Sequence, residues 1–381
     1  MKKAPDPLWV VLPGDIETRT GGYGYDRRIV AGLRDREWLV EVVRLDDAFP
    51  VPDAAARARA AQALAAIPAG STVLIDGLAL GALPEETERE APRLTIVALV
   101  HHPLADETGI DTALAATLAI SERRALAAAH AVVVTSRATA ARLADDGVSA
   151  ERITVVEPGT DPAPLARGSA NSSQRSAPSR TPSAISHQPC DVALLCVATL
   201  TPRKGHELLV EALAAIPHRH WRLTCAGRLD RDPPTTRRLR AQLRASGVED
   251  RVSFAGDLDA AALAQEYDRA DLFVLPTFYE GYGMAVAEAL ARGLPVISTS
   301  TGAIAGLVAG NVRLQPDLAA GIVVPPGDVG ALTDALSRAI GDPKLRAMLA
   351  AGARAARDRL PTWDDAVTAM AGALQQAGGR R

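Results

Sequence analysis

Short apolar runs alternate with longer, alanine-rich segments of helical pattern along most of the chain. In the first half these runs are LWVVLPG (8–14), LVEVVRL (39–45), TVLIDG (72–77), LTIVALVHH (94–102), AVVVTS (131–136) and ITVVEPG (153–159). Continuous apolar runs of this length are typical of strands in a parallel sheet that helices cover on both faces. Residues 1–162 are therefore expected to form one doubly wound α/β domain.

The same alternation of apolar runs and helical segments returns in the second half. A chain of 381 residues is too long for one ordinary hydrophobic core, so a second domain is expected. The runs DVALLCVATL (191–200), WRLTCAG (221–227), RVSFAG (251–256), DLFVLP (271–276), LPVIST (294–299) and GIVVPPG (321–327) predict a second parallel sheet. Residues 191–360 are expected to form a second doubly wound, Rossmann-like domain. Two such domains would face each other across a cleft, and ligands would bind beyond the carboxyl ends of the strands.

The pattern is interrupted between the two halves. The segment RGSANSSQRSAPSRTPSAISHQP (167–189) consists largely of Ser, Pro and Arg, with almost no residue to bury. Such a composition favours a flexible linker or insertion, so residues 163–190 are assigned to neither domain.

Composition narrows the function classes. A net charge of −3 excludes a global field that would attract nucleic acid or an anionic membrane. The N-terminal segment lacks the apolar core of a signal peptide, and no apolar run approaches membrane-spanning length. The protein is expected to be cytoplasmic. Cys190, Cys196 and Cys225 have no metal or redox spacing, and the latter two lie in apolar runs typical of buried thiols.

Candidate chemistry follows the strands of the first half. Gly21, Gly22 and Gly24 precede a helix expected to begin near Tyr25, where backbone N–H groups could approach an anion. A tight strand-to-helix turn is the alternative. The spacing is not G-x-G-x-x-G, which disfavours a nicotinamide site. His101 and His102 end the fourth strand, and no further metal ligands are evident beside them.

Two loops in the second half carry charge. Arg203 and Lys204 precede a helix expected near Gly205, where they could neutralise a diphosphate, unless they form a solvated pair. Glu280 and Glu288 flank a glycine-rich corner, with a helix expected from Gly283 or Met284. Free N–H groups at that helix start suit phosphate, and the two carboxylates suit sugar hydroxyls. A nucleotide sugar has this layout.

The combination of these segments resembles the family-4 glycosyltransferases, the large retaining group with the GT-B fold. The most specific piece is the Glu-x7-Glu motif within PTFYEGYGMAVAEALARGLPVI. PRKGHELL, RVSFAGDL, ADLFVLP and GIVVPPGD are similar to the family in order and spacing, as are TGGYGYDRRIVAGL and VVVTSRATAARL in the first half. The resemblance covers nearly the whole chain except the 167–189 segment.

The resemblance implies roles for individual residues. Four are expected to act in catalysis: Glu280, Lys204, Arg203 and His101. Nine are expected to bind the donor: Gly21, Gly22, Gly281, Tyr282, Gly283, Met284, Glu288, Phe254 and Leu258. Among these, the resemblance implies that Glu288 accepts hydrogen bonds from the ribose hydroxyls and that the segment from Phe254 to Leu258 borders the base. Three are expected on the acceptor side: Tyr23, Tyr25 and His102. The C-terminal helix, about 361–381 and containing Trp363, is expected to pack back on the first domain.

The implied activity is a retaining hexosyltransferase that moves a sugar from a nucleoside-diphosphate sugar to an acceptor hydroxyl without metal or cofactor. UDP is favoured over GDP as the nucleotide. The acceptor would be a glycan, a lipid-linked sugar or a small molecule, with peripheral contact at the inner face of the membrane left open. Alternatives are an inactive nucleotide-sugar-binding regulator, an epimerase of similar architecture and a nicotinamide oxidoreductase.

Overall fold

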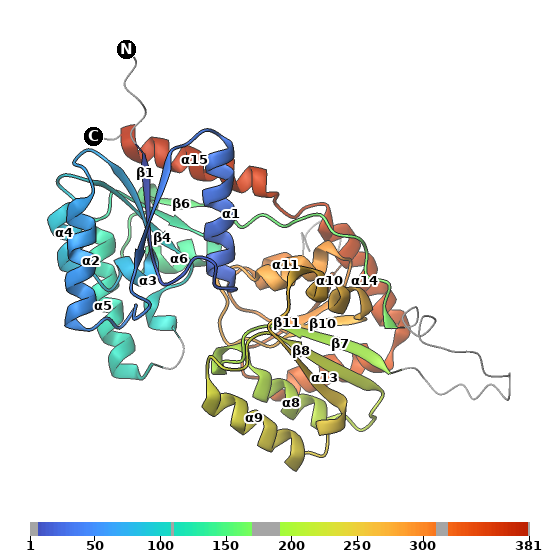
Figure 1. Ribbon diagram of the computed structural model, residues 1–381. Coiled ribbons are helices and arrows are strands. Elements are labelled where there is room, and N and C mark those ends of the chain that lie inside the picture. Colours follow the sequence, from blue (N-terminus) through green and yellow to red (C-terminus); the bar gives the residue numbers. More distant parts are fainter. Residues whose placement is uncertain (1–6, 108–109, 170–190, 310–318, 380–381) are drawn as a thin grey trace, which may run out of the picture. The chain divides into compact units, whose positions relative to one another are not determined.

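The computed structural model describes residues 7–107, 110–169, 191–309 and 319–379. They form two compact units: unit 1 comprises Met1–Gly159 with Pro361–Arg381, and unit 2 comprises Thr160–Leu360. Each unit is built on its own six-stranded sheet flanked by helices (Figure 1). Most of the predicted 163–190 linker, including Cys190, lies outside the described residues.

Unit 1 alternates strands and helices in the predicted order. Its elements are β1 (Leu8–Pro13), α1 (Gly21–Asp35), β2 (Val40–Leu45), α2 (Ala54–Ala66), β3 (Thr72–Asp76), α3 (Gly77–Leu80), α4 (Pro84–Glu90), β4 (Thr95–Val100), η1 (Leu104–Asp106), α5 (Thr112–Ala128), β5 (Ala131–Val134), α6 (Arg137–Asp145), η2 (Ala150–Arg152), β6 (Ile153–Val155) and α15 (Trp363–Gly379).

Unit 2 repeats this alternation. Its elements are β7 (Val192–Val197), η4 (Pro202–Lys204), α8 (His206–Ala215), β8 (Trp221–Ala226), α9 (Pro233–Ala245), η5 (Glu249–Arg251), β9 (Val252–Gly256), α10 (Ala260–Arg269), β10 (Leu272–Leu275), α11 (Met284–Ala291), β11 (Val296–Thr299), α12 (Ile304–Ala309), β12 (Gly321–Val324), α13 (Val329–Gly341) and α14 (Pro343–Arg357).

The strand orders are β2-β1-β3-β4-β5-β6 in unit 1 and β12-β11-β10-β7-β8-β9 in unit 2. Each neighbouring pair runs parallel. The chain therefore winds in opposite directions from β1 and β3, and from β7 and β10. Ligands of doubly wound sheets bind at such a switch point, outside the carboxyl ends of the strands. The predicted fold class, two Rossmann-like α/β domains, is confirmed.

Burial follows position in the sheet. β4, in the middle of the unit 1 sheet, is buried along its whole length, whereas β2 lies at the edge and exposes Glu41 and Val42. The expectation that every strand is covered on both faces is wrong for β2, because an edge strand packs fewer neighbours. Cys196 on β7 and Cys225 on β8 lie opposite each other in the sheet. They are 0% and 3% exposed, which confirms them as buried thiols.

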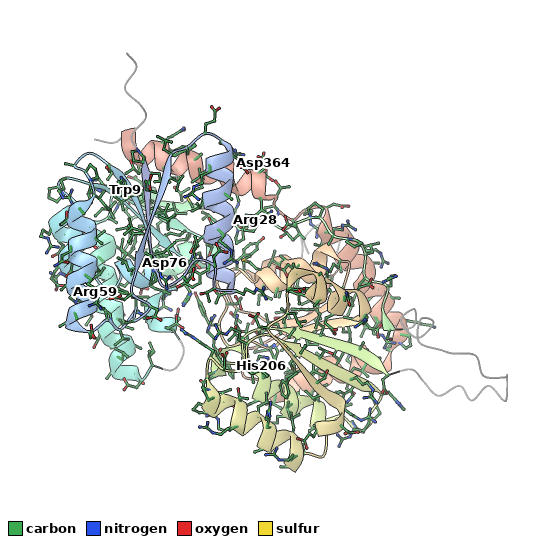
Figure 2. All side chains as sticks on the ribbon, in the orientation of Figure 1. Trp9, Arg28, Arg59, Asp76, His206 and Asp364 are labelled. Carbon is green, nitrogen blue, oxygen red and sulfur yellow. The ribbon has the colours of Figure 1, made fainter. Side chains whose placement is uncertain are left out.

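Helix α15 packs on α1 within unit 1 (Figure 1). Gly32 in α1 leaves room for Val367, since a Cβ at Gly32 would lie 2.4 Å from a Val367 methyl carbon. Arg28 lies on α1 (Figure 2), and its guanidinium carbon is 4.9 Å from the centroid of the Trp363 ring. The last helix of the chain thus completes the first unit.

Candidate functional site

The switch point of unit 2 brings two charged loops together. β7 and β10 are neighbours in the sheet; the loop after β7 carries Lys204, and the loop after β10 carries Glu280. Lys204 Nζ lies 2.5 Å from Glu280 Oε2, and each side chain is 16% exposed. Burial lowers the pKa of Lys204, while the charge of Glu280 opposes that change. The pair is therefore a partly buried ion pair that still reaches the surface.

Lys204 is held by the backbone around it. It ends the 3-10 helix η4, and Gly205 turns into α8 with φ 71°, a left-handed conformation that favours glycine. A Cβ at Gly205 would lie 2.0 Å from the carbonyl oxygen of Pro276 at the end of β10. The loops after β7 and β10 therefore approach too closely for any other residue. The predicted helix start near Gly205 is confirmed, since α8 begins at His206 (Figure 2).

Arg203 ties the same two loops together. Its carbonyl oxygen accepts hydrogen bonds from Phe278 N at 2.7 Å and Thr277 Oγ1 at 3.0 Å. Its Nη1 donates to the carbonyl oxygen of Tyr279 at 3.2 Å. Arg203 thus has a structural task within the protein, and its predicted contact with a diphosphate stays a prediction.

The glycine corner after β10 leads into α11, which begins at Met284 as predicted. Gly283 is the N-cap with φ 97° and has no side chain to satisfy the first N–H groups of the helix. Gly281, Tyr282 and Gly283 are buried, so any ligand contact there would be made by backbone, whereas Met284 is partly exposed. The corner therefore presents helix N–H donors, which favour an anion.

The loop after β11 also contacts this corner. Glu280 N donates to Thr301 Oγ1 at 2.8 Å, and Ala303 N donates to the carbonyl oxygen of Gly281 at 3.1 Å. Gly302 fits beneath because it lacks a Cβ, which would lie 1.6 Å from the carbonyl oxygen of Glu280. The position of Glu280 is thus fixed from β11 as well as from β10.

Glu288 lies one turn into α11 and is partly buried. Its Oε2 accepts a hydrogen bond from the Tyr267 hydroxyl at 3.0 Å. Burial raises the pKa of Glu288, and this hydrogen bond and the charge of Arg292 oppose the rise. Sequence reasoning missed Tyr267, because it shares its helix face with Leu263 and Ala264 and so has the pattern of an ordinary core residue.

Phe254 and Leu258 lie apart from the switch point. Phe254 is in β9, the edge strand, which β8 separates from β7. Its ring packs against the unit 2 core, with the Arg240 guanidinium carbon 5.9 Å from the ring centroid. Leu258 follows β9 and is partly exposed. Among the described residues, neither Phe254 nor Leu258 makes a hydrogen bond or ion pair with Lys204 or Glu280. Their base-binding role stays a prediction.

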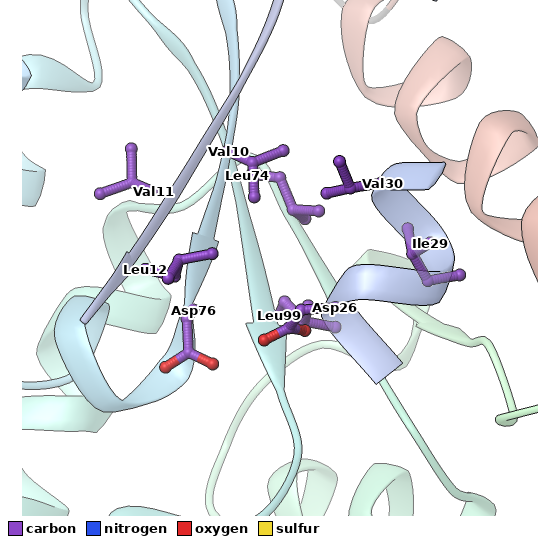
Figure 3. A pocket seen from close by; sticks show the side chains of 9 residues that line it. All are labelled: Val10, Val11, Leu12, Asp26, Ile29, Val30, Leu74, Asp76 and Leu99. Carbon is purple, nitrogen blue, oxygen red and sulfur yellow. The ribbon is translucent and has the colours of Figure 1, made fainter. Parts of the chain in front are cut away.

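His101 is the centre of a charged cluster in unit 1. His101 Nε2 lies 3.2 Å from Asp26 Oδ1 and 3.6 Å from Asp76 Oδ2. Asp26 comes from α1 and Asp76 ends β3, and Figure 3 shows both carboxylates beside Leu99 at the end of β4. Both are at least 95% buried, since they are 3% and 5% exposed, while the side chain of His101 is 18% exposed.

Burial and the neighbouring charges shift the pKa values of Asp76 and His101. Burial and the charge of Asp26 raise the pKa of Asp76 to about 7. Burial alone would lower the pKa of His101, but the two carboxylates outweigh burial and raise it. The ligand atoms of the three residues lie within 4.8 Å of one another, close enough to hold one metal ion. No further ligands are evident beside His101 in the sequence, because the two aspartates are distant along the chain and the topology brings them to it.

Gly21, Gly22 and Gly24 lie within the first turn of α1, whereas they were expected to precede the helix. α1 begins at Gly21 because Thr20 caps it, with its side-chain oxygen accepting a hydrogen bond from Tyr23 N at 3.3 Å. The expected start near Tyr25 is therefore four residues late. Gly22 lies over the imidazole: a Cβ there would be 3.6 Å from His101 Cδ2.

The predicted acceptor-side residues differ in access. Tyr25 is 0% exposed; its hydroxyl donates to the carbonyl oxygen of Val156 at 3.1 Å, and its ring meets His101 edge-on at 5.4 Å between centroids. Direct contact between Tyr25 and an acceptor is therefore excluded by burial, and the residue supports His101 instead. Tyr23 and His102 are partly exposed; Tyr23 donates to the carbonyl oxygen of Pro13 at 2.5 Å, and His102 Nε2 lies 2.9 Å from Glu107 Oε2.

Two family models each match a part of the chain. Residues 76–164 match the family described as Glycosyltransferase Family 4, and residues 185–356 match the family described as Glycosyl transferases group 1. A D-inositol 3-phosphate glycosyltransferase of Xylanimonas cellulosilytica is 33% identical over 273 residues, which cover 69% of this chain and 60% of that protein. The chain thus spans less than two thirds of this relative.

Solved structures share the fold over nearly the whole chain. Sucrose-phosphate synthase from Thermosynechococcus elongatus superposes with a TM-score of 0.77 at 21% identity, covering 98% of this chain and all of that one. Anabaena Alr3699/HepE in complex with UDP superposes with a TM-score of 0.72 at 19% identity, covering 97% of this chain. With the family matches in both halves and the two Rossmann-like units, the chain belongs to the GT-B glycosyltransferases of the family-4 type.

Proposed function

We propose that this protein transfers a sugar from a nucleoside-diphosphate sugar to an acceptor hydroxyl, and that unit 2 binds the donor. The observation that carries the proposal is the Lys204–Glu280 ion pair at the switch point between β7 and β10. It joins a cation for phosphate to a carboxylate for sugar hydroxyls, beside the uncapped start of α11.

Lys204 and the start of α11 would act on the leaving group. When the bond between the anomeric carbon and the phosphate oxygen breaks, negative charge develops on the diphosphate. Fixed donors aimed at such charge usually give the largest catalytic term. Arg203 would add to this field from the neighbouring position. Because these groups supply the positive charge, we propose that transfer needs no metal.

Glu280 would position the transferred sugar and would not act as a nucleophile. Its Oε2 is paired with Lys204, so the carboxylate is held in one orientation relative to the ammonium group. We propose front-face attack: the acceptor oxygen bonds to the anomeric carbon on the side that the phosphate leaves. The acceptor proton passes to the departing phosphate oxygen, and the anomeric configuration is retained.

His101 would contribute from unit 1. Two buried carboxylates favour its charged form and engage its Nε2–H, so the Nδ1–H of the imidazolium would be the donor to a ligand. The family resemblance implies that His101 contacts a hydroxyl of the transferred hexose, and this role stays a prediction. Gly22, over the imidazole, keeps that side free of a bulky side chain.

The names of the relatives indicate which substrates to try first. One is a D-inositol 3-phosphate glycosyltransferase, another is a sucrose-phosphate synthase, and a third was solved with UDP. We propose UDP-sugars as donors, with GDP-sugars second, and phosphorylated polyols or hexoses as the first acceptors. Lipid-linked and glycan acceptors follow.

A turnover assay tests the proposal. The purified chain is incubated with UDP-glucose or GDP-mannose, with inositol phosphate or hexose phosphates, in buffer with EDTA, and released nucleoside diphosphate is measured. Acceptor-dependent release and an α-linked product by NMR are expected. A β-linked product would contradict retention, and activity that EDTA abolishes would contradict metal independence. Tight nucleotide binding without release for any acceptor would favour the regulatory alternative.

A further inference from the structure

Tyr267 is a buried tyrosine whose hydroxyl lies against the start of α11. It comes from α10, and it is 0% exposed. Its hydroxyl oxygen lies 3.0 Å from Glu288 Oε2 and 3.2 Å from the carbonyl oxygen of Ala285. A phenol has one proton, and a carboxylate is the stronger acceptor, so the proton is donated to Glu288.

The ring of Tyr267 is fixed from two further elements. Phe273 in β10 stacks on it with centroids 6.0 Å apart and an angle of 18° between the planes. The Arg292 guanidinium carbon, just after α11, lies 4.3 Å from the ring centroid. Arg292 Nη1 also donates to the carbonyl oxygen of Glu288 at 2.9 Å. The hydroxyl therefore has little freedom to leave the carboxylate.

Glu288 is held at one oxygen and available at the other. Within the described part of the chain, Tyr267 donates to Oε2, and no protein donor reaches Oε1. The residue is partly exposed although its partner is fully buried. A carboxylate on a helix can rotate about three side-chain bonds, and the hydrogen bond from Tyr267 removes much of that freedom.

We propose that Tyr267 is a positioning residue that fixes the Glu288 carboxylate as the acceptor for the ribose hydroxyls, and so makes the site prefer ribonucleotides over their deoxy analogues. The inference rests on the proposed function, in which unit 2 binds a nucleoside diphosphate. It adds the partner that orients the acceptor and a specificity that can be measured.

The charge of the carboxylate depends on the same contacts. Burial and Asp161 raise the pKa of Glu288, while the Tyr267 hydrogen bond and Arg292 lower it. Without the phenol, Glu288 takes up a proton at higher pH. A protonated carboxyl accepts hydrogen bonds poorly. As the pH is lowered, a variant without the phenol should therefore lose its affinity for ribose at a higher pH than the wild type does.

A thermodynamic cycle tests the proposal. Affinities of UDP, or of GDP if it binds more tightly, and of the matching 2′,3′-dideoxy nucleotide are measured by calorimetry with the wild type and Tyr267→Phe. The wild type should prefer the ribonucleotide by about 10-fold to 100-fold, as expected for hydrogen bonds to a charged acceptor. Tyr267→Phe should lower this preference by about 10-fold and leave the dideoxy affinity within about 2-fold.

Two further variants locate the effect. Glu288→Gln should lower the preference as well, and adding Tyr267→Phe to it should lower it no further. Tyr25→Phe is the matched control, because this tyrosine is also 0% exposed and loses a 3.1 Å hydrogen bond to a backbone carbonyl, but in unit 1. It should leave the preference unchanged.

The outcomes separate the two proposals. Failure of the wild type to bind any nucleoside diphosphate would overturn the proposed function, and a wild type that binds both forms equally would overturn the role of Glu288. A strong wild-type preference that Tyr267→Phe preserves, or an equal loss for both nucleotides, would overturn the role of Tyr267 alone. If Tyr267→Phe does not fold, the wild type labelled with 13C at the Cζ of its five tyrosines replaces it. No Cζ resonance shifted by the ribonucleotide alone would overturn the inference.

Discussion

At the scale of single residues, each unit places a cationic side chain near the end of a strand and pairs it with carboxylates. In unit 2 one lysine is paired with one carboxylate, whereas in unit 1 one histidine faces two carboxylates. A buried charge is costly unless it is paired, so each arrangement fixes a charged group at a strand end. Both groups remain partly exposed, which lets a ligand replace some of the missing solvent.

Lys204→Ala tests the cation. The variant removes the charge proposed to meet the diphosphate and leaves Glu280 without this partner, so turnover should fall by about 100-fold to 1,000-fold. Steady-state rates with saturating donor measure the effect. Lys344→Ala is the control, since Lys344 is exposed at the start of α14 in the same unit. A Lys204→Ala rate within a few-fold of the wild type would remove Lys204 from the mechanism.

Asp76→Asn tests the cluster around His101 through the pH dependence of stability. The pKa of Asp76 is about 7 in the folded chain and about 3.9 in an unfolded one. The folded state therefore binds more protons between these values, and ionising Asp76 costs stability as the pH rises through them. The raised pKa of His101 acts in the same direction, because its stabilising charge is lost as the pH rises through the folded value.

Asp76→Asn should therefore raise the unfolding midpoint more at pH 8 than at pH 5, as thermal unfolding at both pH values would measure. Asp53→Asn is the matched control: both aspartates cap a helix, Asp76 through Leu78 N and Asp53 through Ala56 N, but Asp53 is exposed. The control should change the midpoint equally at both pH values. The same behaviour for Asp76→Asn would contradict the buried-carboxyl account.

The site residues that the sequence predicts and the contact residues that it does not indicate differ in how they are positioned. Lys204, Glu280 and Glu288 belong to local motifs after single strands, so the sequence carries their signal. Asp26 and Tyr267 gain their meaning from contacts with His101 and Glu288, 75 and 21 residues away. Spacing along the chain does not encode such pairs, although Asp76, at the end of a buried strand, follows the rule that singled out His101.

At the scale of elements, the apolar runs predict the strands well because each strand of a parallel sheet is a short buried segment. Errors arise at the ends. α1 starts at Gly21 because Thr20 caps it, and the glycines in its first turn disguise the start. A run such as LVEVVRL does not reveal that its strand, β2, lies at the sheet edge, because edge position depends on the order of the strands.

The turn between η4 and α8 gives a prediction at this scale. Gly205→Ala places a Cβ 2.0 Å from the carbonyl oxygen of Pro276, at a residue with φ 71°. Gly247→Ala is the matched control, with φ 62° and nothing within 4 Å of the added Cβ. The control should cost about 1 kcal/mol of unfolding free energy, from backbone strain alone.

Gly205→Ala should cost about 1–3 kcal/mol more than the control, because the loops after β7 and β10 must move apart. Denaturant unfolding measures both variants. Nucleotide affinity should also fall, since the move separates Lys204 from Glu280, whereas the control should bind normally. Equal stability losses for the two variants would show that the close approach of the loops does not constrain the site.

At the scale of the whole molecule, each half of the chain forms one sheet, and α15 at the C-terminal end belongs to unit 1. The described part of the chain contains no helix both long and apolar enough to cross a bilayer. With a net charge of −3, the field of the molecule as a whole does not attract phosphate, so the phosphate binding that we propose depends on local groups. Those groups are gathered at the switch point of unit 2.

The most direct measurement is calorimetric titration of the whole chain with UDP, GDP, ADP and NAD, each in EDTA, alongside Glu280→Gln and Lys204→Ala. The account predicts that UDP or GDP binds at one site per chain, raises the unfolding free energy by about 2.7 kcal/mol at 100 times its dissociation constant, and binds more weakly to both variants. Glu211→Gln, at an exposed position of α8, should bind as the wild type does. Binding of NAD alone, binding of no nucleoside diphosphate, or unchanged affinity in both variants would contradict a donor site at the Lys204–Glu280 pair.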